Sequence, residues 1–210
     1  MHNSHLTDTP YPLSLHHQNK DMGKKLYIKN MVCNRCIMVV KAELEKLGIP
    51  VSSIKLGEVE LVSEKLEDAL KEQLVHVLKG WGFTLIDDKR EQLIEQVKNS
   101  IVELVHQENN SLKINLSAYL SDRIHYDYNY ISNLFSDIEG TTIEKYFIEQ
   151  KIEKVKELIV YDELTLNQIA FELNYSSVAH LSAQFKKVTG LTPSHFKKIK
   201  TEKRKPLDEL

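Results

Sequence analysis

The sequence contains few cysteines, no long apolar run and almost no net charge, and each absence narrows the class of protein. Its two cysteines, Cys33 and Cys36, cannot form the framework of several disulfides that small secreted domains need. No stretch reaches the roughly 20 apolar residues of a membrane-spanning helix. The first residues lack a basic-then-apolar pattern, so we expect no secretion signal, no membrane partner and a cytoplasmic protein.

The net charge of -2 gives no argument for nucleic-acid binding by the chain as a whole, but the distribution of basic residues does. Basic side chains gather near the C-terminal end, where Glu202 alone opposes them before Asp208. They are Lys186, Lys187, Lys197, Lys198, Lys200, Lys203, Arg204 and Lys205. A basic stripe of this kind indicates contact with DNA phosphates, and a solvated tail is the alternative for the last three.

Residues 165–196 have the pattern of two short helices joined by a turn. Thr165 and Ser177 are suited to cap the two helices, Asn174 to form a left-handed turn after the first, and Gly190 to end the second. Apolar residues follow each cap at helical spacing: Leu166, Ile169, Ala170 and Leu173, then Val178, Leu181, Phe185 and Val188. Such a helix-turn-helix unit can place its second helix in the major groove of DNA.

The same pattern occurs once more, about fifty residues earlier in the chain. Asn115 and Asp127 stand where Thr165 and Ser177 stand as caps. The register also holds at the pairs Ile131 and Leu181, Phe135 and Phe185, Gly140 and Gly190, Thr142 and Thr192, and Tyr146 and Phe196. Two copies in step predict an all-α domain with two helix-turn-helix motifs, and two ordinary helical hairpins are the alternative.

Residues 169–198, IAFELNYSSVAHLSAQFKKVTGLTPSHFKK, resemble the second helix-turn-helix motif of the AraC/XylS family of bacterial transcription regulators. Residues 116–159 resemble the first motif of that family and its linking helix. The chain departs from the family at Asn174, where glycine is usual, and at Ser136 and Asp137, which replace a basic pair. The resemblance implies a DNA-binding regulator rather than an enzyme, with double-stranded promoter DNA and RNA polymerase as candidate partners.

Helical spacing turns one side of each expected recognition helix away from the core, and the resemblance places base-reading contacts there. In the second motif the outward residues are Ala179, His180, Ser182, Ala183 and Gln184, followed by Lys186 and Lys187 as phosphate contacts. In the first motif they are Tyr128, Asn129, Ser132 and Asn133. Since glutamine can pair with adenine, Gln184 is a candidate for that contact.

The surroundings of the first motif are acidic, so we expect the second motif to supply most of the affinity for phosphate. A merely solvent-facing helix surface is the alternative for each residue.

The two motifs are expected to be joined by a helix over residues 142–160. At a rise of 1.5 Å per residue, about eighteen residues span about 27 Å. That length is close to the roughly 34 Å between successive major-groove faces, once the motifs themselves are added. One chain could therefore place both recognition helices on one side of the duplex.

The N-terminal part, residues 24–88, has the pattern of a small α+β domain. The expected strands lie at 26–28, 51–56, 58–62 and 83–86, and the expected helices at 37–47 and from a cap at Ser63 to Gly80. The order βαββαβ is the ferredoxin-like one. With the segment MVCNRC after its first strand, the domain resembles the heavy-metal-associated domain of copper chaperones and metal-transporting ATPases. Asn30 stands where that family has glycine.

Cys33 and Cys36 lie three residues apart at the expected start of a helix, where the helix dipole favours thiolates. Thiolates are soft ligands, so the pair suits Cu(I) or another soft metal ion, whereas a closed zinc site would need four ligands. The same spacing suits reversible disulfide formation, and Arg35 would lower the thiol pKa further. A retained pair of cysteines without a present role is the alternative, and Met31 is expected to be a core residue.

The expected organisation has five parts: a disordered tail (1–23) with four histidines, the α+β domain (24–88), a linker helix (89–111), the double helix-turn-helix domain (112–200) and a tail (201–210). The linker helix could pack on either half or on a second subunit, and no heptad run fixes an oligomeric state.

The combination of a cysteine-bearing α+β domain with a double helix-turn-helix domain predicts a one-component regulator that senses a soft metal ion or oxidation. A copper-handling chaperone and a small thiol oxidoreductase are the alternatives, although no catalytic constellation accompanies the cysteines.

Overall fold

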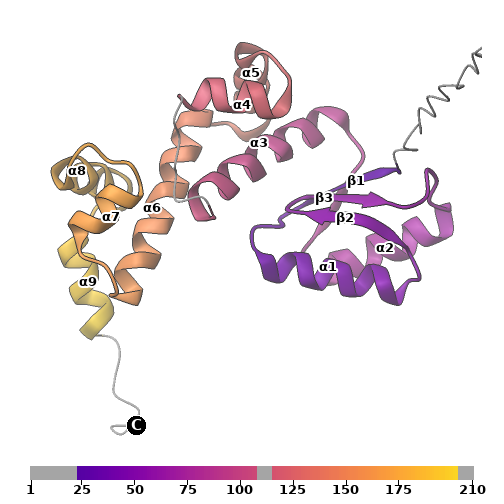
Figure 1. The fold of residues 1–210 in the computed structure, drawn as a ribbon, viewed down its shortest axis with the longest axis horizontal. Helices are drawn as coiled ribbons and strands as arrows, with labels where there is room; N and C mark the ends of the chain where they lie inside the picture. The colour runs from indigo at the N-terminus through magenta and orange to yellow at the C-terminus, as the bar shows by residue number, and fades with distance from the viewer. Residues whose placement is uncertain (1–22, 108–114, 203–210) are drawn as a thin grey trace, which may run out of the picture.

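The structure, a computed structural model, describes residues 23–107 and 115–202, which form a small sheet domain followed by an array of helices (Figure 1). The N-terminal tail with its four histidines, the helix break expected at 108–111 and the basic residues 203–205 lie outside the described residues. Within the described part of the chain, no helix combines the length and the apolar composition that crossing a bilayer requires.

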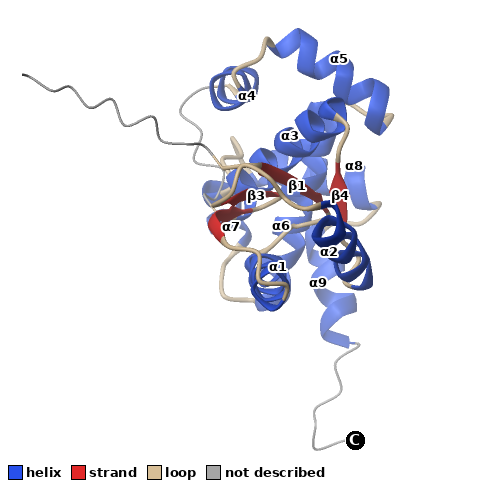
Figure 2. Ribbon diagram, turned by 90° about the vertical axis from the view of Figure 1, so that its right-hand side faces the viewer, coloured by secondary structure: helices blue, strands red, loops and turns tan. Residues whose placement is uncertain are grey.

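Four antiparallel strands form one sheet in the N-terminal domain, in the order β2-β3-β1-β4. Its elements are β1 (Lys25–Lys29), α1 (Asn34–Lys46), β2 (Val51–Lys55), β3 (Glu58–Leu61), α2 (Asp68–Gly80) and β4 (Thr84–Ile86). The strands and helices thus follow one another in the expected order βαββαβ. Both helices lie on the same face of the sheet (Figures 1 and 2).

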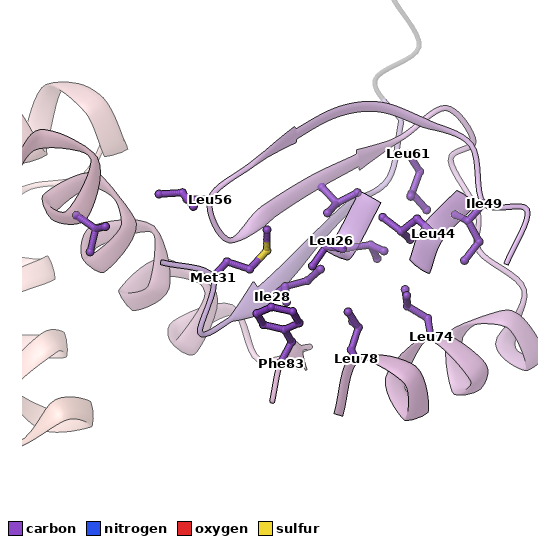
Figure 3. Close-up of a cluster of buried hydrophobic side chains, with 13 residues drawn as sticks. Leu26, Ile28, Met31, Leu44, Ile49, Leu56, Leu61, Leu74, Leu78 and Phe83 are labelled. Atoms are coloured by element: carbon purple, nitrogen blue, oxygen red, sulfur yellow. The ribbon is translucent and has the colours of Figure 1, made fainter. Parts of the chain in front are cut away.

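The core of this domain lies between the sheet and its two helices (Figure 3). Leu26 and Ile28 alternate with more exposed residues along β1 and point into it, as period-2 spacing requires. Leu44 of α1 and Leu74 of α2 close it from the helical side. Met31 is fully buried in the same cluster, which confirms that it is a core residue.

One expected helix cap is wrong. The helix α2 begins at Asp68 rather than after Ser63, and Glu67 occupies the N-cap position. The Ser63 hydroxyl donates to the backbone carbonyl of Lys65 at 2.9 Å and accepts from the Lys65 N–H at 3.2 Å. A serine hydroxyl can satisfy backbone groups through such a local turn as well as through a helix cap. The apolar spacing also continues into this turn at Leu66, so the sequence does not distinguish the turn from the first turn of a helix.

Seven helices make up the rest of the described chain. They are α3 (Lys89–His106), α4 (Leu116–Ile124), α5 (Tyr128–Glu139), α6 (Ile143–Tyr161), α7 (Leu166–Glu172), α8 (Val178–Thr189) and α9 (Pro193–Glu202). The first residues of α4, α5 and α6 precede those of α7, α8 and α9 by fifty positions each. The repeat predicted from the sequence is therefore present in the helix boundaries.

Side-chain caps fix these boundaries in both copies. The four expected caps, Asn115, Asp127, Thr165 and Ser177, each accept a hydrogen bond from a backbone N–H in the first turn of their helix. At Thr165 the cap is reciprocal, because the Gln168 side chain accepts from the Thr165 N–H at 2.9 Å. Asn174 adopts the left-handed conformation expected of it, with φ of 54°.

One residue of the expected apolar stripe is misplaced. Val188, near the end of α8, is 40% exposed. It lines an open groove between α8 and the first turns of α6, together with Ile148 and Lys187, instead of the core. The helical period alone could not show this, because the core beneath α8 ends with Phe185.

The helix α3 packs on both halves of the protein (Figure 1). Leu93, Val97, Ile101 and Val105 lie in one hydrophobic cluster with residues of α4 and α5. Val102, on another side of the helix, belongs to the core of the sheet domain. The linker helix is thus a structural part of the first motif that also holds the N-terminal domain.

The turn between β2 and β3 meets α3 closely at Gly57. This glycine has φ of +68°, and a Cβ atom built on it would lie 1.9 Å from Nδ2 of Asn99. Asn99 is 7% exposed in the contact between the two halves, and its side chain must shift to admit a Cβ atom at Gly57.

We therefore expect Gly57→Ala to destabilise the protein by about 1–3 kcal/mol more than backbone strain alone would. Gly48→Ala is the matched control, since Gly48 has the same φ of +68° but no atom within 4 Å of the position that a Cβ would occupy. Urea unfolding of both variants would measure the difference. Equal losses of unfolding free energy would show that the close approach of Gly57 to α3 does not matter.

Candidate nucleic-acid interface

The helix α8 presents one buried and one exposed side. Leu181 and Phe185 are completely buried in the second helical cluster. The opposite side carries the seven residues expected to face DNA. Ala179, His180, Ala183, Lys186 and Lys187 are exposed, and Ser182 and Gln184 are partly buried.

Lys186 and Lys187 lie in the last turn of α8. Neither forms an ion pair within residues 23–107 and 115–202, so both ammonium groups are available to an external anion. The C-terminal end of a helix favours cations, so the helix stabilises their charge without neutralising it.

The first motif offers a different surface. Asn129 and Asn133 of α5 are exposed, whereas Tyr128 and Ser132 are partly buried. The Tyr128 hydroxyl donates to the Glu144 carboxylate of α6, and burial together with this bond raises the pKa of Tyr128. Tyr128 is therefore tied to α6, and the exposed amides are the freer groups of this motif.

The charge around the first motif is acidic, as expected. Asp122, Asp127 and Asp137 are exposed, and the last turn of α5 carries no basic residue. The fifty-residue counterparts of Lys186 and Lys187 are Ser136 and Asp137. The two motifs thus share a backbone plan but differ in the charge of the surface that follows the recognition helix.

A residue that the sequence analysis missed lies in the middle of α6. Lys151 is only 7% exposed, and its Nζ atom lies 3.8 Å from the ring centroid of Tyr175 and 5.7 Å from that of Phe147. No carboxylate pairs with it in the described chain, and burial lowers its pKa to about 8. The signal was present in the sequence, since Lys151 interrupts the i, i+4 series Ile143, Phe147, Val155 and Ile159.

Tyr175, also missed, connects this lysine to α8. It lies in the turn between α7 and α8, is 8% exposed, and donates its hydroxyl to Oε1 of Gln184 at 2.7 Å. Its ring also meets the edge of the His180 ring at a centroid distance of 5.3 Å. Two residues expected to face DNA are therefore held by one buried side chain. No sequence pattern marks this contact, because a tyrosine in a turn has many equally good partners.

Cys33 and Cys36 form a separate candidate site at the start of α1. Their sulfur atoms are 3.5 Å apart and both residues are partly exposed. The Cys36 backbone N–H is the main cause that lowers the pKa of the Cys33 thiol, against the opposing effect of burial, and the charge of Arg35 adds only a small contribution in the same direction. No group of three or more His, Cys, Asp or Glu side chains within the described residues could hold a metal ion. Two sulfurs alone fit a soft ion of low coordination number and do not fit a closed zinc site.

Comparison with known proteins assigns the helical half. Residues 120–199 match the family described as "Helix-turn-helix domain". The matched range begins near the end of α4 and includes α5 to α8 and most of α9. The helix-turn-helix prediction for the helical half is thereby confirmed, while the sheet domain lies outside the match.

Several regulators are similar to this half of the chain. The uncharacterized HTH-type transcriptional regulator YtdP of Bacillus subtilis is 24% identical over 106 residues, which are 50% of this chain and 14% of YtdP. The chain therefore spans only a small part of that relative. The C-terminal domain of AraT, a response regulator from Geobacillus stearothermophilus, is 19% identical, with a TM-score of 0.46 over 53% of this chain and 88% of that one. The C-terminal domain of the response regulator yesN from Fusobacterium nucleatum is 25% identical, with a TM-score of 0.41 over 46% and 93% of the two chains.

Proposed function

We propose that this protein is a transcription regulator of the AraC/XylS type that binds double-stranded promoter DNA through two helix-turn-helix motifs. The observation that carries the proposal is the surface of α8. Its inner side is fixed in the core by Leu181 and Phe185, while Ala179, His180 and Ala183 are exposed on the outer side, where base edges would lie. The match of residues 120–199 to the helix-turn-helix domain supports the same conclusion.

The two motifs act together because α6 joins them. Both α5 and α8 pack on this helix of 19 residues, which spans about 28 Å. With the motifs added, the recognition helices can enter successive major grooves on one side of the duplex. The second motif supplies most of the phosphate affinity through Lys186 and Lys187, and the first contributes chiefly through Asn129 and Asn133.

The finer organisation is also a proposal. Residues 24–88 form a ferredoxin-like, heavy-metal-associated-like domain, supported by the element order and the sheet order β2-β3-β1-β4. Residues 89–111 link it to the DNA-binding domain at 112–200, with tails at 1–23 and 201–210. The regulator acts in the cytoplasm, with RNA polymerase as a further partner at the promoter. A copper chaperone is the alternative, and the helix-turn-helix match does not favour it.

Cys33 and Cys36 are proposed to make DNA binding responsive to a soft metal ion such as Cu(I), or to oxidation. A chain of contacts supports this coupling. The Asn30 backbone N–H, in the loop before the cysteines, donates to Glu95 of α3 at 3.4 Å. Lys98, one turn further along α3, lies 3.7 Å from Glu95 and 3.2 Å from Glu139, the last residue of α5. A shift of the cysteine loop would thus be transmitted to the first recognition helix.

The DNA-binding proposal predicts the effect of Lys186→Ala with Lys187→Ala. If each lysine neutralises one phosphate, the slope of log affinity against log salt should fall by roughly 2, with affinity weakened about equally for all sequences. The measurement is a salt titration of binding to a DNA site selected from a random pool. Lys41→Ala with Lys46→Ala removes the same charge from exposed positions of α1 and should leave the slope unchanged. An unaltered slope in the α8 variant would contradict the proposal.

The sensing proposal predicts that Cu(I) changes the affinity of the native protein for its selected site, and that Cys33→Ser with Cys36→Ser removes this response. The cause is the loss of both soft ligands, so the affinity without Cu(I) should remain near the native value. Binding measured with and without Cu(I) for both proteins gives the answer. A response of equal size in the serine variant would show that Cys33 and Cys36 are not the site that senses Cu(I).

A further inference from the structure

Lys151 lies in a buried position, where the charge of a lysine lowers the stability of the folded protein. An ammonium group that is nearly sealed from water, with no carboxylate partner among the described residues, destabilises the folded protein. An apolar residue would fit the stripe of Ile143, Phe147, Val155 and Ile159 better. Of the two aromatic rings that the Lys151 Nζ atom faces, that of Tyr175 is the nearer, with its centroid at 3.8 Å against 5.7 Å for Phe147. A residue that lowers stability in this way commonly serves a functional surface that it contacts.

Three elements meet along a single line of contacts. Lys151 comes from α6, Tyr175 from the turn before α8, and Gln184 from α8, where it is partly buried and lines the open groove beside Val188. A cation on the face of a phenol ring draws electron density from it, which makes the hydroxyl a better hydrogen-bond donor. That hydroxyl lies 2.7 Å from Oε1 of Gln184. The buried lysine is therefore placed to strengthen the hydrogen bond that determines how the Gln184 amide is oriented.

The orientation of this amide matters for base reading. Tyr175 is buried and Gln184 is partly exposed, so the amide oxygen bonded to Tyr175 is the inner end and Nε2 is the outer end. Pairing with adenine needs the oxygen to accept from N6 while the nitrogen donates to N7. An amide whose oxygen is engaged by Tyr175 offers its two N–H donors first.

We propose that Lys151 and Tyr175 are positioning residues that set the base preference of Gln184, so that it selects an acceptor edge, guanine O6/N7 or thymine O4, rather than adenine. This inference rests on the proposed function, since it concerns how α8 reads DNA. It replaces the adenine contact that the sequence alone suggests for Gln184.

The test is a selection of bound sequences from a random DNA pool with the full chain and its variants. Gln184→Met identifies the base pair concerned, because its preference should vanish there while the rest of the site is kept. At that base pair the native protein should select guanine or thymine. Tyr175→Phe frees the amide to rotate and should raise the share of adenine relative to the native preference by about fivefold or more.

Lys151 is tested in the same selection. Lys151→Met should broaden the preference toward adenine as Tyr175→Phe does, and Lys151→Arg, which keeps a cation over the ring, should restore the native preference. Melting temperatures are measured in parallel. A purely structural role for Lys151 would change the melting temperature and the active fraction of protein but not the base selected.

The outcomes separate the inference from the function on which it depends. Adenine selected by the native protein, or an identical preference in Tyr175→Phe, overturns the positioning role while leaving DNA binding intact. The positioning role is also overturned if Gln184→Met keeps the native preference at every base pair of the site. Failure of the native chain to enrich any sequence would overturn the proposed function itself, and this inference with it.

Discussion

The helix α6 takes part in both hydrophobic clusters of the helical half, and the arrangement of the two motifs depends on this sharing. Ile143 and Phe147 at its start pack with α4 and α5, while Ile152, Val155 and Ile159 pack with α7 and α8. Because one continuous helix belongs to both cores, neither motif can turn independently without breaking apolar contacts. The distance between the recognition helices is thereby fixed by side-chain packing rather than by a flexible linker. The sheet domain is attached to the first motif by a shared helix too. The helix α3 contributes Val102 to the core of the sheet domain and Val97 and Ile101 to the core of the first motif.

Lys151 lies near the middle of α6, between the two clusters, so that one helix carries both apolar residues that pack in the cores and a charged residue that contacts the second motif. Its neighbours on the stripe give the helix its packing, and it alone among them carries a charge inside. The second motif uses that charge through Tyr175, whose ring and hydroxyl contact His180 and Gln184. Fifty residues before Lys151 stands Ile101 of α3, an apolar residue that packs in the core of the first motif. The two copies of the repeat thus share their caps and differ in their cores and surfaces.

Much of this fold could be predicted because short-range rules determine it. A cap such as Asn115 or Ser177 makes its hydrogen bond within three residues, so sequence position is sufficient to locate it. Contacts between distant segments were not predictable in the same way. The packing of α3 on both halves and the bond from Tyr175 to Gln184 depend on tertiary arrangement, which periodicity does not contain. Ser63 failed as a cap because a local turn satisfied the same hydroxyl.

The rigid coupling of the two motifs through α6 is tested most directly by changing the spacing of the DNA site. Inserting about five base pairs, half a helical turn, between the two halves of the selected operator would move one half to the opposite side of the duplex. Since α6 cannot stretch or twist to follow, we expect affinity to fall to that of the second half-site alone, and an insertion of a full turn to give no recovery. Unchanged affinity for the spaced operators would show that the motifs move independently and would contradict this account.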